Sequence, residues 1–233
     1  MSPEERVFGS ELRRPWLLAN FVAFTVGGAL AGGVLRSIGE PYYGSSISAI
    51  DAGLVQASSL GAAEAIFGLV LGTAQWLVLR RVLRSAWWIP ATCVGFGVAG
   101  AMGGFMSGGS VSTIGPAQGP VPPILALLVG HPISFFVLLG PQWLILRRKV
   151  EYAVLWPIVH LFGFLAAFGL GLAVVRSVVV SVGWLAPTDF PSGKSWVLIG
   201  AAGALVYGVF TWSVLGDFRP RVARPIQRQA PTT

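Results

Sequence analysis

Long apolar stretches separated by short polar segments are the main pattern along this chain. A helix needs about 20 apolar residues to cross about 30 Å of hydrocarbon. Six stretches meet this length, at residues 16–35, 61–79, 87–107, 124–146, 154–175 and 196–215. They are apolar on all sides, without the alternation of a membrane barrel, and lipid requires an internally hydrogen-bonded backbone. The pattern predicts a single all-α membrane domain over residues 1–233, with polar tails at 1–15 and 217–233.

The distribution of positive charge predicts how these spans are oriented. With six spans, thirteen of the 16 Lys and Arg residues fall on one side, in the two tails and in the turns after the second and fourth spans. The other side holds Arg36, Arg176 and Lys194. Because cytoplasmic loops are enriched in Lys and Arg, we expect both termini in the cytoplasm.

One phrase occurs twice in the chain. QWLVLRR at residues 75–81 returns as QWLILRR at residues 142–148, 67 positions later. The last span has Trp212 in the place of the repeated tryptophan. The odd-numbered spans each begin with a tryptophan, at Trp16, Trp88 and Trp156. A repeat of about 70 residues indicates one structural unit used several times, so the sequence predicts three helical hairpins.

Tryptophan and arginine within the repeated phrase indicate a membrane boundary, because indole rings favour the interface and arginine favours the cytoplasmic side. The predicted interface anchors are Trp76, Arg80, Arg81, Trp143, Arg147 and Arg148. Because of the same interface preference, we expect the indole N–H groups of four further tryptophans to lie near water at the cytoplasmic face: Trp16, Trp87, Trp88 and Trp156.

The repeated phrase, followed by an alanine and by a helix start that contains Trp and Pro, resembles uncharacterised bacterial multi-pass membrane proteins with the same Q-W-L-x-L-R-R motif. The resemblance covers residues 60–175 well and the two ends weakly. It implies a location in the bacterial cytoplasmic membrane and implies no particular activity.

Composition excludes other classes of protein. Charged residues make up 11% of the chain, against about 25% in a soluble domain. The net charge of +7 comes from short clusters between apolar runs, which is typical of membrane proteins and disfavours nucleic-acid binding. The single cysteine, Cys93, excludes an intrachain disulfide, and the sequence contains no zinc motif.

Glycine is frequent inside the spans and often recurs at four-residue spacing. The clearest cases are Gly28 with Gly32, Gly68 with Gly72, Gly100 with Gly104, and Gly200 with Ala204 and Gly208. Small residues let helix backbones approach closely in lipid, so the spacing predicts a compact bundle or close contacts to another chain. Residues 95–100, GFGVAG, match a dinucleotide-binding fingerprint, but helix packing is favoured because no strand precedes them.

Polar residues at membrane depth are few, and several occupy matched positions. Gln75, Gln142 and Thr211 correspond in the second, fourth and sixth spans. We expect them to hydrogen-bond to neighbouring helices, with a polar constriction in a pathway as the alternative. Because these even-numbered spans carry the matched polar residues, we expect them to surround a central axis, with the odd-numbered spans outside.

Glu64 and His131 are related by the same offset of 67 positions, and Gly200 takes the third place. Ionisable residues at membrane depth usually face a bundle interior and find a partner. We therefore expect Glu64 and His131 to approach each other beside Gly200, in a structural pair or in a transport or proton pathway.

Histidine provides weak candidates for cofactor binding, at His131 and His160. Their depths differ by about 18 Å at 1.5 Å per residue, so they cannot be the two axial ligands of one haem. A single histidine could hold the magnesium of a pigment. No cofactor is predicted, although an apolar pigment or lipid stays open.

The scarcity of polar chemistry within the spans favours a non-catalytic membrane subunit that packs against protein, lipid or an apolar cofactor in a larger assembly. The expected partners are membrane lipids and other membrane subunits or a second copy of the chain. The alternative is a small transporter or channel that uses Glu64 and His131. An intramembrane enzyme is a third and weaker interpretation, because catalytic groups are few.

Overall fold

The computed structural model describes residues 10–39, 48–111, 139–174, 177 and 193–215, which contain helices and turns but no β-strand. The elements are a 3-10 helix η2 (Ser10–Leu12) and the α-helices α1 (Arg13–Gly39), α2 (Ala49–Leu83), α3 (Trp88–Val111), α5 (Leu155–Val174) and α6 (Gly193–Leu215). Residues 139–146 form a further helical segment. Most of the predicted span at 124–146 lies outside the described residues.

Three helices are long and apolar enough to cross a membrane: Arg13–Ile38, Ile50–Leu83 and Trp88–Phe105. Two shorter apolar helices, Leu155–Gly171 and Gly200–Leu215, also occur in the described part of the chain. By length and composition, the chain is therefore a helical membrane protein.

Helix α2 begins earlier than the sequence predicts. The predicted second span starts at residue 61, whereas the helix already begins at Ala49, so the predicted start is wrong. The Ser48 hydroxyl caps the helix by accepting a hydrogen bond from the Asp51 backbone N–H at 3.2 Å. At its other end, Arg84 adopts a left-handed conformation (φ 49°), and its N–H bonds to the Arg80 carbonyl. The 35 residues of α2 span about 50 Å, which is more than a bilayer core.

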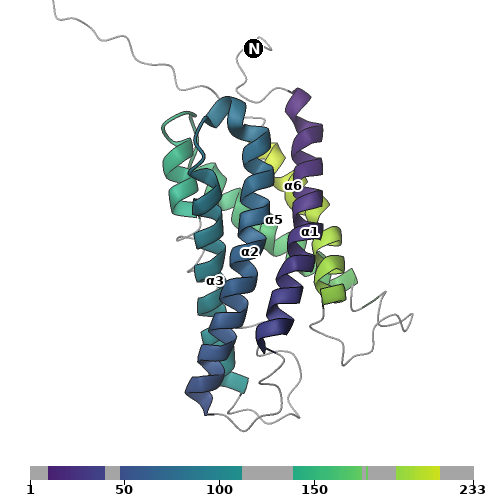
Figure 1. Cartoon of the computed structure of the whole chain (residues 1–233). Helices are drawn as coiled ribbons and strands as arrows, with labels where there is room; N and C mark the ends of the chain where they lie inside the picture. Colours follow the sequence, from purple (N-terminus) through teal and green to yellow (C-terminus); the bar gives the residue numbers. More distant parts are fainter. Residues whose placement is uncertain (1–9, 40–47, 112–138, 175–176, 178–192, 216–233) are drawn as a thin grey trace, which may run out of the picture.

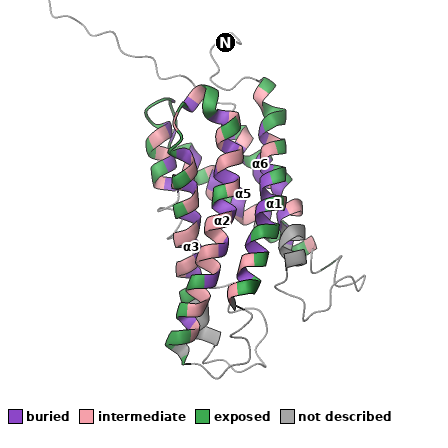
Figure 2. Cartoon of the chain, viewed as in Figure 1, coloured by how far each residue is buried: buried purple, intermediate pink, exposed green. Residues whose placement is uncertain are grey.

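Neighbouring helices run antiparallel. Helix α2 packs against both α1 and α3, and α6 packs against both α1 and α5 (Figure 1). Gln142, in the segment 139–146, hydrogen-bonds to Thr92 of α3 and to Trp156 of α5. The helices thus follow one another around a ring that closes where α6 meets α1. Figure 2 shows buried residues on the sides that face neighbouring helices and exposed residues on the outer sides.

The prediction that the odd-numbered spans lie outside is wrong. Trp16, Trp88 and Trp156, from α1, α3 and α5, are fully buried and lie together in the interior. The ring of Trp156 lies 5.6 Å from that of Trp88 and 6.2 Å from that of Trp16, between centroids. We call these three residues the Trp layer.

The expectation that these three indole N–H groups lie near water is also wrong, because each finds a hydrogen-bond acceptor inside the bundle. A buried indole is stable under that condition. Trp87, the neighbour of Trp88, is 75% exposed and fits the interface expectation.

Helices α2 and α3 meet along a seam of glycine residues. A Cβ atom added at Gly68 would lie 2.7 Å from the Thr92 carbonyl oxygen, and one at Gly100 would lie 2.5 Å from the Leu60 carbonyl oxygen. The four-residue glycine spacing therefore does allow close backbone approach, as predicted.

Candidate functional site

Three hydrogen bonds of the same kind join successive parts of the ring. In each, a Trp-layer indole at the start of one helix donates from Nε1 to a polar side chain near the end of another. The pairs are Trp88 with Gln75 Oε1 (3.3 Å), Trp156 with Gln142 Oε1 (3.0 Å) and Trp16 with Thr211 Oγ1 (3.0 Å). The predicted polar residues Gln75, Gln142 and Thr211 are all fully buried, so none of them points outward from the bundle.

A second group of polar residues lies one turn further along the odd-numbered spans. Asn20, Thr92 and His160 each follow a Trp-layer residue by four positions, and all three are fully buried. Gln75 donates from Nε2 to Asn20 Oδ1 at 3.0 Å, and Gln142 donates from Nε2 to Thr92 Oγ1 at 2.6 Å. Each glutamine amide is thus engaged at both ends, within its own hairpin and with the next helix.

His160 contacts a tyrosine, whereas Asn20 and Thr92 are each bonded to a glutamine amide. The Tyr207 hydroxyl lies 2.8 Å from Nδ1 of His160. Gln75 Nε2 also donates to this hydroxyl at 3.4 Å, which connects α2 with α6. We call these seven residues the polar layer: Asn20, Gln75, Thr92, Gln142, His160, Tyr207 and Thr211.

Aromatic rings cover the polar layer on the side away from the Trp layer. Phe24, Phe96 and Phe164 follow the three tryptophans by eight positions each, and Phe67 of α2 joins them. Phe67 lies between two of them, with ring centroids 5.1 Å from Phe24 and 5.2 Å from Phe96, and Phe96 lies 6.0 Å from Phe164. We call these four residues the Phe layer. Stacked indole, polar and phenyl layers therefore close this end of the bundle.

Most of these partners were not predicted from the sequence, which was expected to place its matched polar residues on the even-numbered spans. Asn20, Thr92 and His160 nevertheless share one offset from tryptophan on the odd-numbered spans. The fixed spacings of four and eight positions from each tryptophan are the signal that would have identified both the polar layer and the Phe layer.

The predicted anchors lie at the Trp-layer end of the bundle. Arg80, Arg81, Arg147 and Arg148 are exposed. The Arg147 guanidinium lies over the Trp143 ring, 4.8 Å from its centroid, in a cation–π arrangement. Trp76 is partly buried, and its N–H has no hydrogen-bond partner within the described residues.

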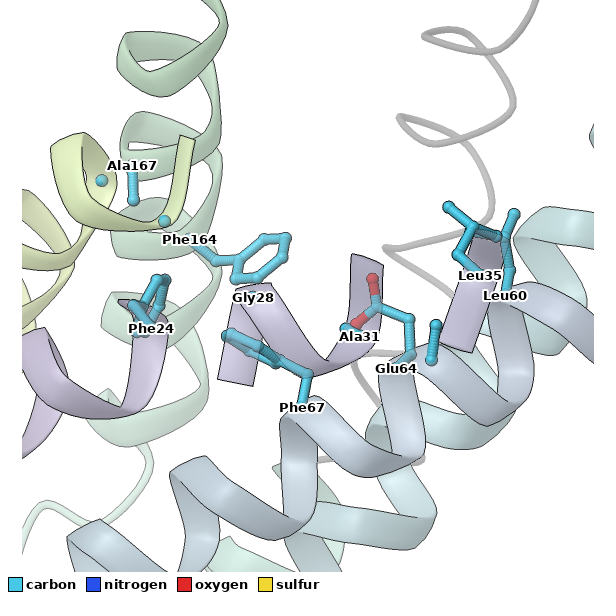
Figure 3. A pocket seen from close by; sticks show the side chains of 12 residues that line it. Phe24, Gly28, Ala31, Leu35, Leu60, Glu64, Phe67, Phe164 and Ala167 are labelled. Carbon is cyan, nitrogen blue, oxygen red and sulfur yellow. The ribbon is translucent and has the colours of Figure 1, made fainter. Parts of the chain in front are cut away.

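Glu64 lies on α2 and points into a cavity on the far side of the Phe layer. α1, α2, α5 and α6 form this cavity, and its walls include Gly28, Phe67, Phe164 and Gly200. Figure 3 shows the Glu64 carboxyl between Phe67 and Phe164 on one side and Leu35 and Leu60 on the other. Gly200 lines the same space, as the repeat predicts, but His131 lies outside the described residues. The predicted pair of Glu64 and His131 therefore stays a prediction.

The histidine and acidic side chains that the structure describes lie apart from one another. The His160 ring is fully buried between Trp156 and Tyr207 and is hydrogen-bonded to the tyrosine hydroxyl. This leaves no open face of His160 for a pigment. Within the described ranges, no three His, Cys, Asp or Glu side chains are grouped so that they could hold a metal ion.

Among the described residues, the fold and the buried layers define a helical membrane protein with a hydrogen-bonded polar layer at one end and a cavity toward the other. Comparisons with family models, with curated proteins and with solved structures gave no match.

Proposed function

We propose that the protein is a non-catalytic integral membrane subunit, which packs against protein, lipid or an apolar cofactor in a larger membrane assembly. The observation that carries this proposal is the closed interior. Gln75 does not line the cavity that contains Glu64, and the Phe layer lies between the two residues. A transporter needs a polar path that continues through the membrane, whereas a packing subunit is compatible with a dry, small-residue seam.

The proposal includes six spans in three repeated hairpins. The repeated hydrogen bond from a tryptophan indole to a glutamine or threonine supports this arrangement. In the third instance, Trp16 of α1 bonds to Thr211 of α6, which would join the first hairpin to the last. Residues 139–146 are then the end of the fourth span. The exposed arginines at the Trp-layer end support a cytoplasmic location for that end and for both termini. The resemblance to bacterial multi-pass proteins supports a bacterial cytoplasmic membrane.

The outer surface of α1 is where a partner packs in this proposal, because it exposes a row of apolar side chains. Leu18, Val22, Val26 and Leu30 are spaced by four residues and are 46–63% exposed. They form one apolar stripe along the helix. A stripe of this kind contacts either lipid or another membrane helix.

Photo-crosslinking in native membranes tests the proposal. A photoreactive amino acid would be placed at Leu18, Val22 or Val26, and at the exposed loop residue Glu151 as a control. We expect a protein adduct of one defined mass from one face of the bundle, and a matching complex after extraction in mild detergent. A monomer that carries neither protein nor small molecule, with lipid adducts alone at every position, would overturn the proposal.

A small transporter or channel is the second candidate, and one observation favours it. Glu64 is an ionisable residue that lines a cavity at membrane depth, as pathway residues often do. Liposomes that contain the protein would show ion or proton flux that Glu64→Gln abolishes. Equal flux in protein-containing and empty liposomes would eliminate this candidate.

A further inference from the structure

The cavity that contains Glu64 is large enough for a small ligand. Its volume, counted as space open to the centre of a water-sized sphere, is about 50 Å³. Because a water needs about 10–15 Å³ on this measure, the cavity has room for roughly three or four waters or for the head of a small organic molecule.

The described part of the cavity wall has one sign of charge. Among the described residues that line the cavity, Glu64 has the one charged or polar side chain, and the rest are aliphatic, phenylalanine or glycine. Phe24, Phe67 and Phe164 contribute the aromatic part of the wall. A phenyl ring is negative on its face and attracts cations, so both the carboxyl and the rings favour a positive ligand.

The Glu64 carboxyl also lacks a partner inside the protein. Within the part of the chain that the structure describes, no hydrogen bond or ion pair to it is found. The contrast with the polar layer is clear, since the Gln75 amide there is bonded at both ends. An isolated carboxylate in apolar surroundings is costly unless a cation or a donor reaches it.

We propose that this cavity binds an ammonium group carried on a short apolar chain. The Glu64 carboxyl accepts hydrogen bonds from the ammonium, and Phe24, Phe67 and Phe164 surround the adjoining carbons. Among the described lining residues, an anion would meet a carboxyl and no basic group, and a divalent cation would find too few oxygen ligands. The site rests on the proposed function only in that the chain is embedded in a membrane.

Calorimetric titration of the full-length protein in phosphatidylcholine nanodiscs tests the site, with empty nanodiscs as the blank. The probes are n-hexylamine and 1-hexanol, which have the same chain length and differ in charge. We expect the amine to bind about tenfold more tightly than the alcohol, because charge-assisted bonds and cation–π contacts form with the amine alone. Glu64→Gln should remove this preference, and the matched control Glu151→Gln, at an exposed turn residue, should keep it.

Two sources of the ammonium are distinguished by lipid composition. If phosphatidylethanolamine in the nanodisc weakens hexylamine binding to the wild-type protein, the ammonium comes from a lipid headgroup. If it does not, the ligand is a free amine. Both results support the site, and neither depends on whether the chain has a protein partner.

Equal affinity of the wild-type protein for hexylamine and hexanol would overturn the proposal, as would unchanged amine binding in Glu64→Gln. A second variant, Ala63→Leu, keeps the carboxyl but fills space beside it, because Ala63 is a buried residue in the cavity wall. This variant should lose amine binding. If it retains full affinity, the amine binds elsewhere.

Discussion

The two ends of this helical bundle are stabilised in different ways. At the Trp-layer end, large side chains interlock, and the amide and indole groups between them form hydrogen bonds. At the Glu64 end, glycine residues bring backbones into contact, and a cavity surrounds a carboxyl group that has no partner among the described residues. Glycine also brings backbones together beside the polar layer, where Gly68 and Gly72 contact Thr92, so the ends differ in the large hydrogen-bonded side chains of one and the cavity of the other.

This difference indicates where the protein can tolerate functional chemistry. Buried polar groups that satisfy one another specify a rigid arrangement and leave nothing free for a ligand. A carboxyl in an apolar cavity lowers stability unless something binds it, which is typical of residues retained for function. At the Trp-layer end, removing a large side chain should lower the stability of the fold. At the Glu64 end, adding a methyl group should lower it, and removing the charge of Glu64 should raise it.

The largest effect is expected from Trp88→Ala, at the Trp-layer end. The change removes a fully buried indole that contacts Trp156 and leaves the Gln75 carbonyl without its donor. We expect a loss of about 3–5 kcal/mol in the free energy of unfolding. The matched control is Trp87→Ala, one residue away and 75% exposed, where the change should be about 0.5 kcal/mol or less. Unfolding by sodium dodecyl sulfate in mixed micelles measures both, and equal losses would contradict the interior location of Trp88.

A smaller loss is expected when a methyl group is added at the other end. In Gly104→Ala, the new Cβ would collide with the Gln56 backbone across the seam between α2 and α3. Overpacking of this kind costs about 1–3 kcal/mol. Among the described residues, no atom outside the local helix lies within 4 Å of the corresponding position at Gly103, so Gly103→Ala should be close to neutral. The same unfolding measurement would refute the close seam if the two variants behaved alike.

The polar layer should respond to loss of a single amide. Gln75→Leu keeps the approximate size of the side chain but leaves Asn20 Oδ1 without its donor and the Trp88 indole N–H without its acceptor. We expect a loss of about 1–2 kcal/mol, since hydrogen bonds between membrane helices are individually modest. Thr73→Val is the control, because the Thr73 hydroxyl bonds only within its own helix in the described structure, to Leu69. A loss for Gln75→Leu no larger than that for Thr73→Val would mean that the amide network adds no stability.

The sequence predicted the helical, apolar character of the chain and the burial of its glycine seam from local patterns. These features follow from composition and from four-residue spacing, which one helix determines by itself. Trp16, Trp88 and Trp156 were assigned to the interface because tryptophan prefers it. The three tryptophans are buried in the interior instead, because each indole N–H finds a hydrogen-bond acceptor on another helix.

The site was less predictable than the helices. The sequence identified Glu64 and its correspondence with Gly200, but the cavity between them depends on the distances among four helices. A Cβ at Gly200 would lie 2.5 Å from the Phe24 carbonyl oxygen, so α6 and α1 are in close contact beside the cavity. No pattern within a single helix contains that information.

The smallest effect, and the one of opposite sign, is expected from Glu64→Gln in ligand-free protein. Glutamine has nearly the same shape as glutamate and carries no charge, so the apolar cavity should accommodate it more easily. We expect a gain of about 1 kcal/mol or less, because Glu64 is only partly buried and so its carboxylate loses only part of its hydration. Glu151→Gln, at an exposed turn residue, is the control and should leave the unfolding midpoint unchanged. A loss of stability in Glu64→Gln would show that the carboxyl has a stabilising partner in the folded chain, and the two ends of the bundle would then follow the same rule.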